Sequence, residues 1–199
     1  MVSNRVSDSA ARAEPVALPE AEATANACLL AWKIEAALAE HGPDPRSRLI
    51  VLCGAEVPAW RAAAQLGAAY AALGWNTVVV DDSCPAEPEA GTRAAREASV
   101  VPTSKPRLSV VRQQSATALA EVRSTREFIQ SLASHFERVV VATGVPQVAM
   151  AVAPALAMEA DAVVIVVQPG RTLRQTVTTA LTALRELRAP VVGIVLSDE

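Results

Sequence analysis

The sequence contains few residues of the kinds that cross-link small domains or bind metals. It has three cysteines and two histidines among 199 residues, and aromatic residues make up 3% of the chain. The cysteines, Cys28, Cys53 and Cys84, are odd in number, widely spaced and form no CxxC motif. This pattern excludes a disulfide framework and favours a reducing compartment. The histidines, His41 and His135, lack the spacing of metal ligands.

Charge of one sign and long apolar runs are also scarce. The net charge is −3 and no basic tract occurs, so we do not expect a dedicated nucleic-acid binder. The longest apolar run, Val148 to Met158, has 11 residues and contains Pro154. A membrane span needs about 20. Since the N-terminal residues also lack the apolar core of a signal peptide, we expect a cytoplasmic protein whose membrane contact is at most peripheral.

Alanine, in contrast, is abundant. It accounts for 41 of the 199 residues, and 51% of the chain is hydrophobic. Alanine is the best helix former, so these numbers predict helices packed closely on a flat surface. Residues 1–19, rich in Ser, Ala, Glu and Pro without periodicity, are predicted to form a flexible N-terminal arm. The remainder, 20–199, is predicted to be a single α/β domain of ordinary size.

Short apolar runs alternate with helical periodicities along this domain. The runs predict strands at 49–53, 77–80, 108–111, 138–142, 162–167 and 191–196. The periodicities predict helices at 20–41, 58–73, 117–135, 147–159 and 172–188, with Thr172 as the N-cap of the last. Residues 83–106 are predicted to be a loop with one helical segment, 89–98. The predicted fold class is therefore a doubly wound, mainly parallel sheet with helices on both faces.

In such sheets ligands bind beyond the carboxyl ends of the strands, and the segments there resemble those of one family. The family's strand, phosphate loop and first helix are similar to LIVLCGAEVPAWRAAAQLGAAYAALG. Its two acidic motifs are similar to NTVVVDDS and FERVVVATGVP. The family's closing segment is similar to the stretch ADAVVIVVQPGRTLRQTVTTALTALRELRAPVVGIVLS. The chain thus resembles the cytoplasmic domain of bacterial tyrosine kinases, the CpsD/CapB and Wzc group of ParA/MinD-like P-loop NTPases. The resemblance covers residues 48–197 and implies a P-loop NTPase-like fold.

The phosphate loop lacks the groups that its chemistry requires. A Walker A loop uses glycines to turn backbone N–H groups toward phosphate, a lysine to reach it, and a hydroxyl to hold Mg²⁺. After Gly54 the sequence reads AEVPAWRAAA, without glycine, lysine or hydroxyl. Arg61 takes the place of the lysine when the segment is aligned from the strand, and Ala59 does when it is aligned from the helix. Arg61 is thus either an anion-binding residue at a helix N-terminus or a solvated or salt-bridged surface arginine.

The two acidic motifs also depart from the family. Asp81 matches the first aspartate of one motif, whereas Ser83 stands at the second; a carboxylate there either orients metal and water or caps a loop. Ala142, followed by Thr143, stands where the Walker B motif has its magnesium-binding aspartate. We therefore expect no cofactor, no metal and no catalytic residue. The positions of a vestigial pocket are Gly54, Arg61, Asp81, Ser83, Ala142 and Thr143.

The resemblance and these departures together predict a non-catalytic kinase-like protein, a pseudokinase. By resemblance, its partner is a membrane-anchored polysaccharide co-polymerase of the Wzz/Wzc type, which would hold it at the inner membrane. Its function would be to regulate or scaffold exopolysaccharide or capsule biosynthesis and export. Two alternatives stay open: an active ATPase or tyrosine autokinase that uses Arg61 and Asp81, and a ParA/MinD-like positioning protein.

Assembly and partner contacts are less defined by the sequence. The resemblance allows a homo-oligomer, although the family's E-x-x-R-x-x-R ring motif is not matched, because Glu22 is followed by Ala25 and Cys28. The family's tyrosine-rich tail is replaced by a single tyrosine, Tyr70, on the core side of a predicted helix. The tryptophans are each either core residues or partner contacts: Trp32, Trp60 and Trp75.

Overall fold

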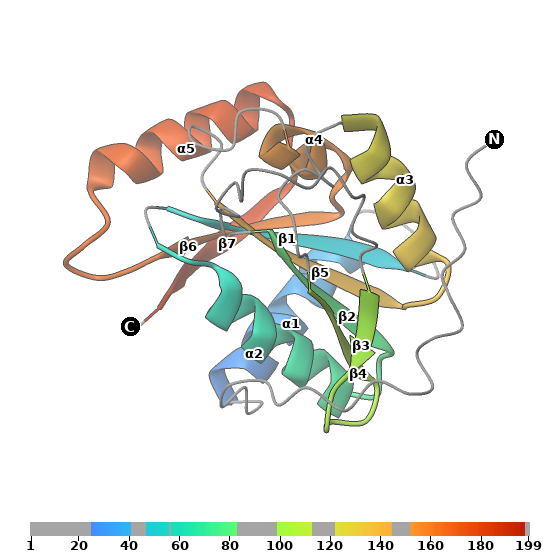
Figure 1. Ribbon diagram of the computed structural model, residues 1–199. Helices are drawn as coiled ribbons and strands as arrows, with labels where there is room; N and C mark the ends of the chain where they lie inside the picture. The colour runs from blue at the N-terminus through green and yellow to red at the C-terminus, as the bar shows by residue number, and fades with distance from the viewer. Residues whose placement is uncertain are drawn as a thin grey trace, which may run out of the picture.

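The computed structural model describes residues 25–40, 47–55, 57–82, 99–112, 122–144 and 152–197. Within these ranges seven strands form one sheet, and helices cover both of its faces (Figure 1). The predicted arm at 1–19 and the predicted helical segment at 89–98 lie outside the described residues. No helix in the described ranges is long and apolar enough to cross a membrane.

The sheet has the strand order β3-β4-β2-β5-β1-β6-β7. All neighbouring strands run parallel except β3, which pairs antiparallel with β4. The predicted fold class, a doubly wound and mainly parallel sheet, is confirmed. The strands are β1 (Arg48–Gly54), β2 (Thr77–Asp82), β3 (Ser99–Pro102), β4 (Leu108–Arg112), β5 (Arg138–Gly144), β6 (Ala162–Val167) and β7 (Val191–Leu196).

Two layers of helices enclose the sheet. Helices α1 and α2 lie on one face, and α3, α4 and α5 lie on the other (Figure 1). Every residue of the central strands β1 and β6 is buried, because helices exclude water from both sides. The helices are α1 (Ala25–Ala39), α2 (Trp60–Ala72), α3 (Val122–Ala133), α4 (Val152–Glu159) and α5 (Arg174–Glu186).

Small residues let α2 approach the sheet closely. Its inner face is built from buried alanines together with Leu66 and Tyr70. Gly67 marks the closest approach, since a methyl group placed there would lie 2.3 Å from Cγ2 of Val79. The close packing that the alanine content predicts is therefore present in this helix.

Two sequence predictions were wrong in detail. Strand β3 falls inside 83–106, which was predicted to be a loop; it is short and ends at Pro102, so its apolar signal is only two valines long. The N-cap of α5 is Leu173, which makes no side-chain cap hydrogen bond, and not Thr172. Thr172 instead bonds to the loops at the end of the sheet, as described below.

A buried arginine at the amino end of the strands connects α1 to the sheet. The guanidinium of Arg138, the first residue of β5, is fully buried and donates from Nε and Nη2 to the two carboxylate oxygens of Glu35 on α1, both at 2.9 Å. The Trp75 ring stacks on it, with the ring centroid 3.8 Å from Cζ. Burial, followed by the nearby Glu35 carboxylate, raises the pKa of Tyr70, which packs on the same guanidinium. The predicted core location of Tyr70 is confirmed.

Candidate functional site at the carboxyl ends of the strands

The structure brings most of the predicted pocket positions together at the carboxyl ends of β1, β5 and β2. In the strand register, Asp81 lies beside Ala142, and Cys53 lies beside Thr143. Gly54 is the last residue of β1 and lies beside Gly144. Ser83 lies outside the described residues.

The side chains at this edge divide between the two faces of the sheet. Successive side chains in a strand point to opposite faces, and Val79 and Val140 contact the α1–α2 face. Asp81 and Ala142 therefore face α2, whereas Thr143 faces the opposite layer. Ala142, the position predicted to correspond to the Walker B aspartate, thus lies on the α2 side of the sheet and carries a methyl group.

The loop after β1 turns a carbonyl group over Gly54. A Cβ at Gly54 would lie 1.9 Å from the Val57 carbonyl oxygen, so only glycine fits this turn. Pro58 has no N–H, and the Ala55 N–H donates to the Val166 carbonyl of β6 at 2.8 Å. A phosphate loop needs N–H groups turned inward, and this loop has fewer of them to offer.

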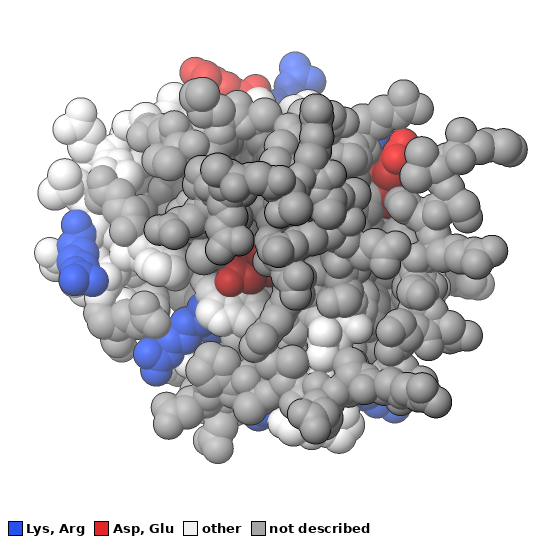
Figure 2. Space-filling model, in the orientation of Figure 1, with Lys and Arg blue, Asp and Glu red and all other residues white. Residues whose placement is uncertain are grey.

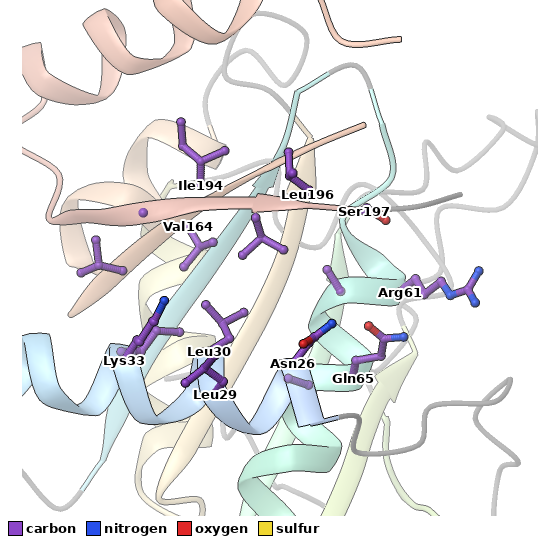
Figure 3. A pocket seen from close by; sticks show the side chains of 16 residues that line it. Asn26, Leu29, Leu30, Lys33, Arg61, Gln65, Val164, Ile194, Leu196 and Ser197 are labelled. Atoms are coloured by element: carbon purple, nitrogen blue, oxygen red, sulfur yellow. The ribbon is translucent and has the colours of Figure 1, made fainter. Parts of the chain in front are cut away.

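The start of α2 carries little that could hold an anion. Its N-cap, Ala59, makes no side-chain hydrogen bond, and Trp60 packs against the apolar core. Arg61 is exposed, and its guanidinium extends outward from the helix, away from the neighbouring cavity (Figure 3). The anion-binding and the surface interpretation of Arg61 both stay predictions.

The interior of the site is apolar. Ala142 is fully buried and belongs to the same cluster as Ala59 and Ala63. On the other face, Thr143 is also fully buried, and its Oγ1 has no hydrogen-bond partner among the described residues. Burial raises the pKa of the neighbouring Cys53 thiol to about 12, so it stays protonated and a poor nucleophile.

Thr172 fastens the loop after β6 to the loop after β1. Its Oγ1 donates to the Ala55 carbonyl at 3.0 Å and accepts from the Gln168 N–H at 2.9 Å. Sequence reasoning missed this role, because a threonine just before a helix is also a common N-cap. The signal in the sequence was Gly170, two residues before Thr172, because glycine favours turns. In the structure the φ of Gly170 is +76°, which marks a turn before the helix begins.

The groups described at this edge do not match those that hold a magnesium triphosphate. The Val57 carbonyl oxygen lies close over Gly54, the segment AEVPAWRAAA after Gly54 has no lysine or hydroxyl, and the position predicted for the Walker B aspartate is a buried alanine. In the part of the chain that the structure covers, no three His, Cys, Asp or Glu side chains form a cluster that could hold a metal ion.

A cavity of about 590 Å³ lies beside this edge, between α1, the start of α2 and the last two strands (Figure 3). Leu30 and Lys33 of α1 line one wall, and Val164 and Val195 line the floor.

Of the three tryptophans, Trp32 on α1 is 65% exposed, whereas Trp60 and Trp75 pack against the core. The face drawn in Figure 2 shows Lys and Arg side chains scattered among acidic ones, without a continuous basic patch among the described atoms.

Comparison with known proteins gives the fold a counterpart. No family model matches the sequence, and no curated protein does. Among solved structures, the chimerical protein CapA2B2 has a TM-score of 0.64 at 20% identity, covering 83% of this chain and 82% of its own. This chain shares the fold of that protein.

Two bacterial tyrosine kinase domains also share the fold. The kinase domain of the Escherichia coli tyrosine kinase ETK has a TM-score of 0.65 at 15% identity, over 94% of this chain and 85% of its own. The BceF tyrosine kinase domain has a TM-score of 0.64 at 16% identity, over 86% of this chain and 76% of its own. The predicted resemblance to this group of P-loop proteins is confirmed at the level of fold.

Proposed function

We propose that this protein is a non-catalytic kinase-like domain that docks on a membrane-anchored polysaccharide co-polymerase and regulates or scaffolds exopolysaccharide or capsule biosynthesis and export. The observation that carries the proposal is the buried Ala142, which lies in an apolar cluster at the position predicted for the magnesium-binding aspartate. A methyl group cannot hold Mg²⁺, and the loop after Gly54 has no lysine or hydroxyl to hold phosphate and metal.

The missing groups are those that do most of the work in phosphoryl transfer. Catalysis of this reaction depends on positioning and on electrostatic stabilisation of the transferred phosphoryl group by lysine, magnesium and backbone donors. Removing one preorganised donor in an enzyme of another class reduces kcat by about 10²–10³-fold. Because lysine, hydroxyl and Walker B carboxylate are all absent, we expect no measurable transfer.

The assignment of the partner is an analogy. It rests on the similarity to the CpsD/CapB group and on the fold shared with the BceF and ETK kinase domains. In this proposal the protein contributes a folded surface and is held at the inner membrane by its partner. The homo-oligomer that the resemblance allows is compatible with such a scaffold.

Calorimetry with Mg-ATP and Mg-ADP at hundreds of micromolar tests the catalytic half of the proposal. We expect no heat of binding. Micromolar binding that is lost in Arg61→Ala would overturn it in favour of an ATPase or autokinase with an unusual loop. Arg185→Ala, which removes an exposed arginine from the end of α5, is the matched control for a general change in charge.

Affinity purification from detergent-solubilised membranes tests the other half. We expect a polysaccharide-export membrane protein to be recovered with the wild-type chain, and recovery to fall when the same tag is placed on an unrelated protein of the same fold. Recovery of a chromosome- or division-associated protein in its place would favour the ParA/MinD-like alternative and contradict the proposed partner.

A further inference from the structure

The cavity beside α1 borders a residue of β7 that has no side chain. Ile194 and Leu196 point away from α1 (Figure 3), so the alternation of side chains along the strand turns Gly193 toward α1. A Cβ placed at Gly193 would meet nothing within 4 Å, and the backbone there does not have a positive φ. A glycine inside a strand often marks a place where a ligand approaches the backbone closely. Gly193 therefore leaves space in the wall of the cavity of about 590 Å³.

The side chains on either side of this space are apolar. Val164 of β6 is fully buried, and Val192 and Val195 of β7 pack half-buried against the same core cluster. Leu29 and Leu30 of α1 line the cavity across from them (Figure 3). Small-molecule sites are usually cavities of about 300–1,000 Å³ with a mainly apolar lining and a few polar groups. The apolar part of a ligand would therefore lie between α1 and β7.

The charges that line the cavity have one sign. Lys33 and Arg61 are the charged residues of the described lining, and none of that lining is acidic. The Lys33 side chain rises from α1 toward β7, whereas the Arg61 guanidinium extends outward (Figure 3). Lys33 makes no ion pair with another residue of the described ranges. One ammonium group therefore faces an apolar cavity, which favours a ligand with an apolar body and a single negative charge.

The position of Lys33 on α1 sets the length of the apolar body. At the other end of the cavity, Asn26 of α1 and Gln65 of α2 present amide groups (Figure 3). Asn26 precedes Lys33 on the same helix by about 10 Å along the axis. An extended alkyl chain advances about 1.3 Å per carbon, because its C–C bonds are about 1.5 Å long. The chain of octanoate or decanoate therefore spans the cavity, whereas that of butyrate is too short.

We propose that this cavity binds a medium-chain fatty acid, with the carboxylate at the Lys33 ammonium and the alkyl chain against Val164, Gly193 and Val195. A carboxylate carries the single charge that one ammonium group pairs with, whereas a phosphate group carries more. Because Lys33 is exposed, its ion pair contributes only a few-fold to the affinity, and the buried alkyl chain contributes most of it. This binding involves neither a nucleotide nor the proposed membrane partner.

Calorimetry with octanoate, decanoate and octanol at low salt tests the roles of the chain and the charge. We expect decanoate to bind roughly 15-fold more tightly than octanoate, because it buries two more methylene groups. The ratio of octanoate to octanol affinity should fall by about three- to fivefold in Lys33→Gln and be kept in Lys33→Arg. Lys105→Gln, which removes the only other lysine of the chain, is the matched control and should leave this ratio unchanged.

Gly193→Leu tests where the alkyl chain lies. The new side chain projects into the cavity, so binding of both fatty acids should be lost. The melting temperature should not fall, because glycine is unfavourable inside a strand. Ile194→Phe adds bulk on the other side of β7 and should leave binding unchanged. A wild type that binds neither fatty acid, an affinity ratio that Lys33→Gln leaves unchanged, or undiminished binding in Gly193→Leu overturns the proposal.

Discussion

The two ends of the parallel strands are built in opposite ways. At the amino end, buried charges are paired: Arg138 with Glu35, and Arg48 with Asp161 at 3.5 Å. At the carboxyl end, where sheets of this kind bind ligands, the corresponding interior position is Ala142, and the Val57 carbonyl oxygen lies close over Gly54 of the neighbouring strand.

This difference separates the groups that hold the fold from those that would perform chemistry. A paired buried charge ties distant elements together, and leaving one partner unpaired costs far more than the pair contributes. The Arg138 cluster joins α1, β5 and the turn before β2 without any ligand. Charge pairs at the amino end therefore hold the fold together, while Ala142 and its described neighbours at the carboxyl end form an apolar interior.

The largest expected effect comes from restoring a carboxylate at the carboxyl end. Ala142→Asp buries a charge in an apolar cluster, so we expect a loss of about 4 kcal/mol at neutral pH, measured by urea unfolding. Burial raises the pKa of the new carboxyl group in the folded state. The loss should therefore be small below about pH 4 and should grow as the pH rises above the ordinary Asp value.

Ala36→Asp, at an exposed position of α1, is the matched control and should change stability little. If Ala142→Asp were as stable as the wild type and bound Mg-ATP in calorimetry, the contrast between the two ends would be wrong, because a usable magnesium site would be present.

Breaking the pair at the amino end should have the next largest effect. Glu35→Ala leaves the Arg138 guanidinium buried without its carboxylate, and we expect a loss of about 3 kcal/mol in the free energy of unfolding. The Glu35 side chain keeps 27% exposure, which admits some water and moderates the loss. Glu40→Ala, just beyond α1, removes an exposed carboxylate as a control. Equal stability of the two variants would mean that the cluster is not structural.

The turn at Gly54 can be tested against its register partner. In Gly54→Ala the new methyl group collides with the Val57 carbonyl, so we expect a loss of about 2 kcal/mol. A methyl group at Gly144, beside it in the sheet, meets nothing within 4 Å, and Gly144→Ala should cost little. A similar melting temperature for both variants would show that the loop is free to move, contrary to the closed turn described above.

Sequence reasoning predicted the sheet well and the site only in part. The six predicted apolar runs all became strands, and those of β1 and β6 are buried on both faces, whereas β3 was missed because two valines give too short a signal. Absences such as the missing lysine can be read directly from the sequence. The sequence alone does not predict the Val57 carbonyl over Gly54 or the pairing of Arg138 with Glu35. Each is a contact between separate residues, and the residue types do not indicate which residues will meet.

The smallest effect is expected where one hydroxyl joins the two loops of the carboxyl end. Thr172→Val keeps the shape of the side chain but removes the bonds to the Ala55 carbonyl and the Gln168 N–H, which should cost about 1 kcal/mol. Thr178→Val removes only a bond to the Arg174 carbonyl on the exposed face of α5 and should be nearly neutral. Hydrogen exchange should show faster opening at Gln168 in Thr172→Val alone, because that amide loses its acceptor. Unchanged exchange there would mean that the loops at this end are held by the strands and not by Thr172.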